Sequence, residues 1–110
     1  MRTLFLTCLL SASLLANVAA AEDAPDQHLN IKNHAFVPQE LTVPANHKIK
    51  LTIKNDDTTP VEFESDDLNR EKVVPANGSV TVYLDPLDPG TYEFFDDFHR
   101  DTTGKIIAKP

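Results

Sequence analysis

Apolar and polar residues alternate in short segments that recur along the chain from residue 29 onward. The clearest are residues 48–54 (Lys-Ile-Lys-Leu-Thr-Ile-Lys) and 79–84 (Ser-Val-Thr-Val-Tyr-Leu). A period of two places alternate side chains on opposite faces of a β-strand, so each segment predicts a half-buried strand. Further short strands are expected at 29–33, 41–43, 61–64, 91–95 and 105–108, and only residues 66–72 could form a helical turn.

Turn-forming residues separate these segments, for example Pro44-Ala45-Asn46 and Asp88-Pro89-Gly90. Short strands at near-regular spacing with turns between them predict an all-β protein, an antiparallel β-sandwich. Two facing sheets would bury alternate apolar side chains of the strands. The expected core consists of Ile49, Leu51, Ile53, Val61, Phe63, Val80, Val82, Leu84, Tyr92 and Phe94.

The first 21 residues have a different character. Arg2 is followed by an apolar stretch that ends in Ala19-Ala20-Ala21, which predicts a cleaved secretory signal peptide and export to the periplasm. The stretch is too short and too often interrupted for a membrane span of about 20 residues, so no membrane insertion is expected. Residues 22–27 are polar and predict a flexible lead-in, and residues 28–110 predict one domain.

The charge and the cysteine content narrow the function classes. The net charge of −7 becomes more negative when the signal peptide and its Arg2 are removed. Nucleic acid is therefore an unsuitable partner, whereas cations and basic protein surfaces are suitable ones. The single cysteine, Cys8, lies in the predicted signal peptide, so the exported part has neither a disulfide nor a thiolate ligand. Motifs of nucleophilic hydrolases and phosphate-binding loops are absent from the sequence.

The segment 60–65 (Pro-Val-Glu-Phe-Glu-Ser) is the first that could hold a cation. Alternation sends Val61 and Phe63 to one face and both carboxylates, Glu62 and Glu64, to the other. Two acids on one face can converge on a metal ion. The solvated face of an ordinary strand explains the same pattern equally well at this point.

The segment 94–99 (Phe-Phe-Asp-Asp-Phe-His) is the second segment that could hold a cation. Asp96 and His99 are separated by two residues, a spacing at which one loop can present both side chains to a metal. Carboxylate oxygens with one imidazole nitrogen suit iron, manganese or zinc and can take copper(II). Taken alone, this segment is explained equally well by an exposed acidic turn with a surface histidine.

Three segments in order resemble the cupredoxin family: residues 36–46 (FVPQELTVPAN), 55–64 (NDDTTPVEFE) and 86–96 (PLDPGTYEFFD). The resemblance implies a Greek-key β-sandwich. In that family the last of these strands delivers a cysteine, which is followed by a histidine and commonly a methionine. Here Asp96 matches the cysteine and His99 the histidine, and the segment after Pro60, where the first histidine is usual, carries Val61 and Glu62. A blue-copper centre needs the thiolate, so electron transfer by such a centre is excluded.

The runs 62–72 (EFESDDLNREK) and 94–99 resemble more closely the cupredoxin-like domains of periplasmic iron-uptake systems, of the EfeO and FtrB types. That resemblance implies iron binding ahead of an inner-membrane iron permease, together with a companion periplasmic iron-binding protein. By position it implies Glu62, Asp96 and His99 as metal ligands. Glu64, Asp97 and His34 are the secondary candidates. Ferrous oxidation is implied as an activity, and whether the protein catalyses it stays open.

Two further functions stay open from the sequence. The first is a copper(II)-binding periplasmic carrier that uses the same loop and lacks the blue thiolate band. The second is a metal-free module whose acidic face docks a basic partner.

Overall fold

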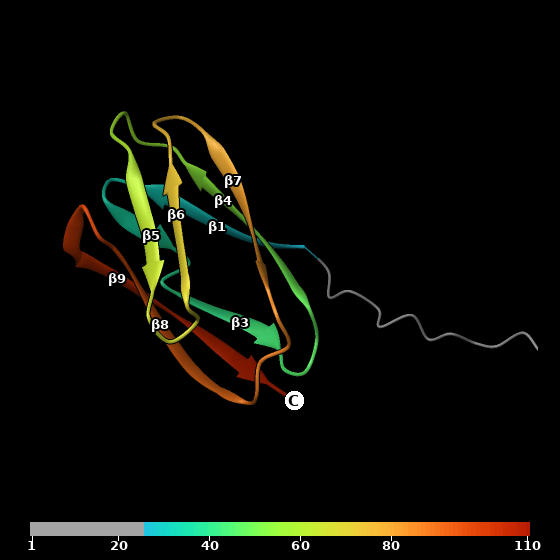
Figure 1. Cartoon of the computed structure of the whole chain (residues 1–110). Helices are drawn as coiled ribbons and strands as arrows, with labels where there is room; N and C mark the ends of the chain where they lie inside the picture. Colours follow the sequence, from blue (N-terminus) through green and yellow to red (C-terminus); the bar gives the residue numbers. More distant parts are fainter. Residues whose placement is uncertain (1–25) are drawn as a thin grey trace, which may run out of the picture.

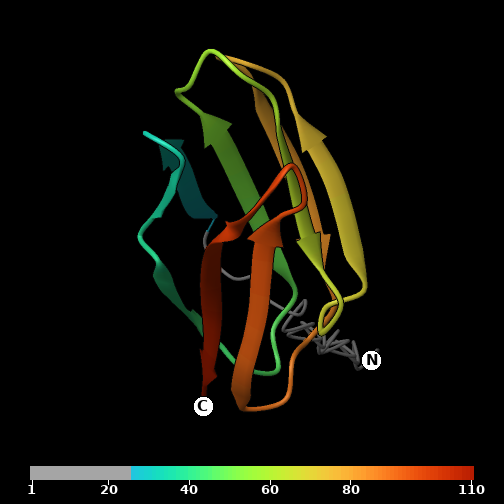
Figure 2. The same cartoon turned by 90° about the vertical axis from the view of Figure 1, so that its left-hand side faces the viewer.

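The computed structural model describes residues 26–110, which form two β-sheets packed face to face (Figures 1 and 2). The described residues contain no helix that could cross a membrane. The four-stranded sheet has the order β2 (Ala35–Val37), β1 (Gln27–Lys32), β4 (Ile49–Asn55) and β7 (Ser79–Leu84). The five-stranded sheet has the order β3 (Glu40–Pro44), β9 (His99–Lys109), β8 (Gly90–Asp96), β5 (Val61–Ser65) and β6 (Arg70–Val74).

The predicted all-β sandwich is confirmed, with one difference in strand direction. Strand β1 runs parallel to β4, and β3 runs parallel to β9, whereas all other pairs are antiparallel. The expectation of a purely antiparallel sandwich did not include these two pairs. Both join strands that are not consecutive in the sequence, so alternation within each strand says nothing about their relative direction.

The core lies between the sheets and contains the predicted residues. Eight of the ten are buried, and the other two, Val80 and Tyr92, are partly buried against the same cluster. Three phenylalanine rings pack at its centre. Phe36 and Phe94 meet edge to face with ring centroids 4.9 Å apart, and the centroids of Phe63 and Phe94 are 5.1 Å apart. Aromatic pairs in this range add to the stability gained from apolar burial.

Three local predictions are corrected by the structure. Residues 66–72 do not form a helical turn: a turn is followed at Arg70 by strand β6, which pairs with β5. Strand β2 was also not predicted, because three residues are too few to show a period. Strand β1 begins at Gln27, inside the predicted lead-in. The predicted signal peptide and the rest of the lead-in, except Asp26, lie outside the described residues.

Three connections that bear on the candidate sites lie at one end of the sandwich, the upper end in Figures 1 and 2. They are the β1–β2 turn, the β4–β5 loop and the β8–β9 turn, and we call this end the loop end. Oδ1 of Asp57, in the β4–β5 loop, accepts a hydrogen bond of 2.8 Å from the backbone N–H of Asn33 in the β1–β2 turn. The C-terminus lies at the opposite end (Figure 1).

Candidate metal sites

Three carboxylates converge on the outer face of the five-stranded sheet. Glu62 and Glu64 alternate along β5 with core residues, so their side chains lie on the face away from the core. Asp97 follows β8, and its backbone N–H donates to the carbonyl of Glu62 at 2.9 Å. One carboxylate oxygen from each of Glu62, Glu64 and Asp97 lies within 4.8 Å of the others. We call these three residues the acidic group.

Mutual repulsion changes the protonation of this group. A hydrogen bond with the Glu71 side chain, loss of hydration, and repulsion by Glu71, Asp97 and Glu64 raise the pKa of Glu62 to about 7. Loss of hydration and repulsion by Asp97 and Glu71 raise the pKa of Glu64 as well. Glu71 lies directly opposite Glu64 in the β5–β6 pair. The group thus carries more negative charge than its surroundings neutralise, and a bound cation would relieve this repulsion.

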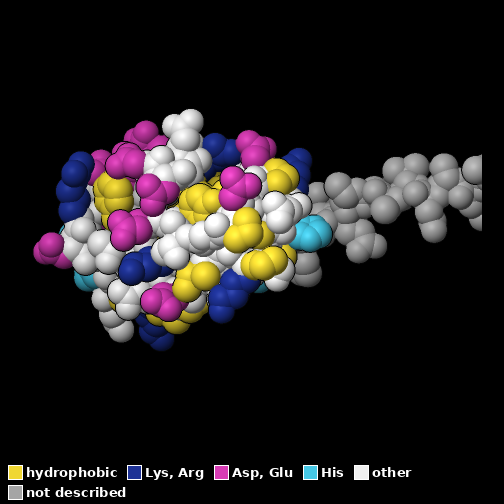
Figure 3. All heavy atoms as spheres, turned by 90° about the horizontal axis from the view of Figure 1, so that it is seen from below, with side chains coloured by type: hydrophobic (Ala, Val, Ile, Leu, Met, Phe, Trp, Pro, Cys, Tyr) yellow, Lys and Arg dark blue, Asp and Glu magenta, His cyan; other side chains and the backbone are white. Residues whose placement is uncertain are grey.

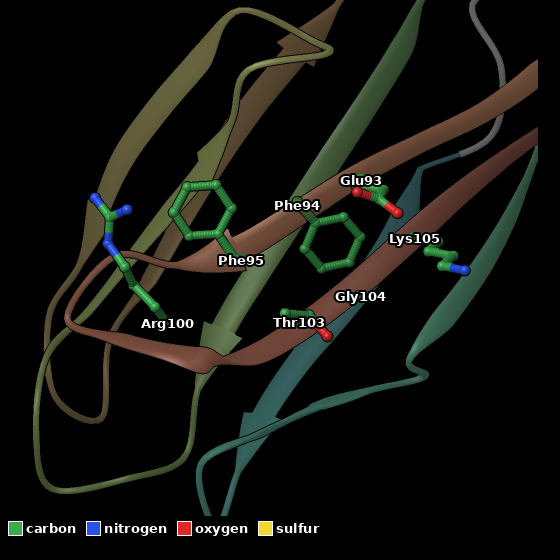
Figure 4. A pocket seen from close by; sticks show the side chains of 7 residues that line it. All are labelled: Glu93, Phe94, Phe95, Arg100, Thr103, Gly104 and Lys105. Atoms are coloured by element: carbon green, nitrogen blue, oxygen red, sulfur yellow. The ribbon is translucent and has the colours of Figure 1, made fainter.

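Arg100 partly neutralises the acidic group. Its Nη2 lies 2.7 Å from Oδ1 of Asp97, in an ion pair whose angle does not fit a hydrogen bond. The guanidinium also lies over the Phe95 ring, 5.6 Å from its centroid. Figure 4 shows both side chains on the rim of a surface hollow of about 300 Å³ between β8 and β9. Arg100 therefore competes with any cation that binds Asp97.

Asp96 points the other way, into the sandwich. Its side chain is 1% exposed, and it occupies the same face of β8 as the buried Phe94. Oδ1 accepts hydrogen bonds from the backbone N–H groups of Glu62, at 3.1 Å, and Phe98, at 3.0 Å. Nδ1 of His99 lies 3.2 Å from Oδ2. The structure thus brings Asp96 and His99 together, but the Glu62 side chain lies on the opposite face of the sheet, with Glu64 and Asp97.

The third secondary candidate, His34, lies beside His99 at the loop end. The centroids of the two imidazole rings are 5.0 Å apart, with the ring planes inclined at 48°. The six predicted residues therefore fall into two sets. Glu62, Glu64 and Asp97 form one on the outer face of the sheet, and Asp96, His99 and His34 form the other at the loop end.

The residues do not fit a blue-copper centre. Such a centre needs one thiolate and two imidazoles around the ion. The residue that matches the cysteine is Asp96, whose carboxylate already accepts backbone N–H groups. The segment where the first histidine is usual carries Val61, which is 1% exposed in the core, and Glu62, and neither is a histidine. Residues 26–110 contain no cysteine.

The comparisons agree with this geometry and define its class. The family model of the cupredoxin-like domain matches residues 4–108. The chain belongs to the cupredoxin-like domain family. It is 40% identical over 114 residues to the uncharacterised protein RP394 of Rickettsia prowazekii (strain Madrid E), covering 96% of this chain and 90% of that protein.

Solved structures show the same fold. Amicyanin from Paracoccus versutus aligns with a TM-score of 0.61 and 17% identity, over 81% of this chain and 88% of that one. A purple cupredoxin from Nitrosopumilus maritimus aligns with a TM-score of 0.59 and 20% identity, over 76% of this chain and 100% of that one. A reduced Cu(I) form of an amicyanin mutant aligns with a TM-score of 0.64 and 18% identity, over 83% of this chain and 90% of that one.

Sequence reasoning missed two residues that shape these sites. Glu71 was not among the candidate residues, and in the structure it is the largest cause of the raised pKa of Glu62. Strand β6 carries no clear alternation, so no sequence pattern indicated that Glu71 lies opposite Glu64. Asp57 was also not among the candidate residues, although it lies in the segment 55–64 that resembles the cupredoxin family.

Proposed function

We propose that this protein is a periplasmic metal-binding cupredoxin-like protein that binds iron at the acidic group and delivers it to an inner-membrane iron permease. The observation that carries the proposal is the convergence of three carboxylates, Glu62, Glu64 and Asp97, within 4.8 Å. Oxygen ligands suit hard and borderline cations. Membership of the cupredoxin-like family supports a metal-binding function, since one structural neighbour is described as a Cu(I) form.

The charge of the acidic group suits ferric iron better than ferrous iron, because three carboxylates stabilise the ion of higher charge more strongly. Binding there favours loss of one electron from ferrous iron to an acceptor such as dioxygen. Oxygen consumption on addition of ferrous iron would measure whether this oxidation is catalysed.

The acidic surface also suits the transfer step. Acidic side chains are interspersed with basic and apolar ones over the lower end of the molecule (Figure 3), and the net charge of the whole chain is −7. A strongly negative protein attracts cations and docks to basic surfaces. A permease, or a companion periplasmic iron-binding protein, with a basic face would therefore be a suitable partner.

The experiment is a calorimetric titration with ferrous iron without oxygen, and with ferric citrate in air. Glu62→Gln, Glu64→Gln and Asp97→Asn are each expected to weaken iron binding by about 10-fold or more, as loss of a charged ligand does. Glu40→Gln is the matched control, because Glu40 is an exposed acid in β3 outside the acidic group. Equal affinity in the wild type and all three variants would contradict the proposal.

Metal analysis of protein taken from the periplasm identifies the ion that is bound in cells. Copper(II) outcompetes iron(II) at most sites of mixed ligands, so the titration is repeated with both metals present. Copper found at the acidic group in place of iron would overturn the iron assignment. A thermal midpoint that no metal changes would favour the metal-free docking module, because a ligand that binds only the folded state raises stability.

A further inference from the structure

We propose that the outer face of the four-stranded sheet is a docking surface for a membrane of anionic phospholipid, which it contacts through a group of lysines. This surface goes beyond the proposed function, because the acidic group lies on the outer face of the other sheet, on the opposite side of the sandwich (Figure 1). It consists of the outward side chains of β1, β4 and β7 together with Lys48. We call it the basic face.

Acidic residues are divided unequally between the two sheets. Among the strands that the structure describes, those of the four-stranded sheet contain no aspartate or glutamate. The strands of the five-stranded sheet contain seven: Glu40, Glu62, Glu64, Glu71, Glu93, Asp96 and Asp101. A chain with a net charge of −7 thus has one sheet whose strands add no negative charge. Such an asymmetry orients a protein in the field of a charged surface.

Four lysines lie on or beside the basic face. Lys32, Lys50 and Lys54 alternate along β1 and β4 with fully buried residues, so their side chains lie on the outer face of the sheet. Lys48 precedes β4, and its Nζ lies over the Tyr83 ring, 5.8 Å from the centroid. The rise along a strand separates Lys50 from Lys54 by about 13 Å. The four ammonium groups can therefore contact one flat surface together.

Two acids at the ends of strands flank the basic face without neutralising it. Asp26 precedes β1, and its Oδ2 lies 3.8 Å from Nζ of Lys50. Asp56 follows β4, and its Oδ1 lies 3.4 Å from Nζ of Lys54. All four side chains are between 30% and 56% exposed, and exposed ion pairs of this kind are weak. Lipid phosphates can replace either aspartate, and four lysines against two aspartates leave the face positive.

The composition of the basic face fits a lipid surface better than a protein partner. Protein interfaces are enriched in arginine and aromatic side chains and depleted in lysine and serine. The outward residues of β1, β4 and β7 include three lysines, no arginine and one phenol ring, that of Tyr83. A second copy of this chain is also a poor partner, because each copy carries a net charge of −7. Anionic lipids present a continuous negative charge, which attracts each nearby lysine.

Docking through the basic face sets the direction of the acidic group. Glu62, Glu64 and Asp97 lie on the outer face of the five-stranded sheet, and an anionic surface repels carboxylates. The field that attracts the lysines therefore turns the acidic group toward the solution. The acidic group stays accessible to ions while the protein is bound to the membrane.

The test is co-sedimentation of untagged protein, purified from the periplasm, with lipid vesicles. One set of vesicles is neutral phosphatidylcholine, and the other contains equal parts of phosphatidylcholine and phosphatidylglycerol. Binding to the anionic vesicles is expected at about 20 mM salt and is expected to be lost at about 500 mM, where charges are strongly screened. Equal binding to both sets, or no binding to the anionic set at low salt, would overturn the proposal.

Two triple variants with the same change of charge locate the contact. The first removes the three strand lysines of the basic face: Lys32→Gln, Lys50→Gln and Lys54→Gln. The second removes three exposed lysines of the five-stranded sheet: Lys72→Gln, Lys105→Gln and Lys109→Gln. The first is expected to bind anionic vesicles about 100-fold more weakly, because each lysine near such a surface contributes about 5-fold. The second is expected to stay within about 2-fold of the wild type. Equal losses in the two variants would rule out a specific face.

Spin labels report the orientation without changing any lysine. Residues 26–110 contain no cysteine, so Thr81→Cys labels the middle of the basic face and Thr103→Cys labels the outer face of the other sheet. A water-soluble nickel chelate is expected to lose access to the first label on anionic vesicles and to keep access to the second. Loss of access at the second label alone would refute the orientation.

Sedimentation velocity of the protein without lipid tests the alternative occupant. Salt-sensitive self-association that disappears in the first triple variant, but not in the second, would assign the basic face to a second copy and overturn the membrane assignment. A single monomeric species at low salt is expected. Iron titration of the first triple variant is expected to match the wild type, so failure of the iron site and failure of the basic face are seen separately.

Discussion

Asp96 is buried at the junction of both candidate sites, so its replacement tests how the loop end is held. Asp96→Ala removes the acceptor of two backbone N–H groups, those of Glu62 and Phe98. A buried donor without a partner costs about 1–3 kcal/mol. Both donors lie in partly buried surroundings, so the lower half of this range applies to each. The expected loss of unfolding free energy is about 2–4 kcal/mol, which for a domain of this size lowers the thermal midpoint by roughly 10–30 °C.

Asp96→Asn keeps an oxygen acceptor for the same two N–H groups and loses only the charge. Hydrogen bonds to a charged acceptor are about twice as strong as neutral ones, so the expected loss is about 1 kcal/mol or less. Asp97→Ala is the neighbouring control, and it is expected to lie within about 0.5 kcal/mol of the wild type, because its ion pair with Arg100 is at the surface. Urea unfolding of the four proteins measures all three differences. The reasoning is refuted if Asp96→Asn is as destabilising as Asp96→Ala, or if Asp96→Ala matches the control.

Other predictions concern separate features of the chain. Arg100→Ala removes the cation beside Asp97, so it should raise iron affinity about 2- to 5-fold in the same calorimetric titration. Unchanged affinity would argue against competition between Arg100 and iron for Asp97. Gly104→Ala places a methyl group against Cζ of Phe94 and 2.9 Å from the Gln39 carbonyl oxygen; Figure 4 shows Gly104 beside the Phe94 ring. Urea unfolding should therefore show a loss of about 1–3 kcal/mol, and a neutral result would contradict the packing. The raised pKa of Glu62 makes the folded protein keep a proton that the unfolded chain releases above about pH 4.5, so the stability from this group should fall as pH rises through about 7. Thermal midpoints from pH 4 to 8 should fall less steeply in Glu71→Gln, and parallel curves would contradict this origin of the shift.

The sandwich and most of its core followed from alternation, because burial between two sheets repeats every second residue. Strand β4 shows this clearly, since Ile49, Leu51 and Ile53 are all fully buried. Strand β6 shows the limit: Glu71, Lys72 and Val73 are all exposed at the edge of the sheet, so burial leaves no period in this segment. Strand β6 forms because it pairs with β5 along the edge of the sheet, and this pairing cannot be read from the sequence of β6 itself.

The two sets of site residues could be identified by type but not fully sorted by position. Alternation placed Glu62 and Glu64 on one face, and the structure agrees. It could not place Asp96 and Asp97, because the predicted strand ended at residue 95 and alternation applies only within a strand, whereas β8 continues to Asp96. Asp96 joins the core side while Asp97 pairs with Glu62, because the backbone of Asp97 hydrogen-bonds Glu62. That pairing is a long-range contact between β5 and the end of β8.

Asp96, which matches the cysteine of the family, therefore has a structural role in this chain instead of a metal-binding one. A ligand there would have to point a free donor atom at a metal, whereas Asp96 uses Oδ1 to hold two N–H groups and Oδ2 to orient His99. Val61, in the segment where the first histidine is usual, adds to the core instead of the site. With both interior positions used for structure, the available metal-binding atoms lie outside the core, as carboxylates on the sheet face and imidazoles at the loop end. The candidate ligands of the proposed iron site therefore lie on the surface of the sheet rather than in a closed centre, which is compatible with the binding and release of iron that the proposed function requires.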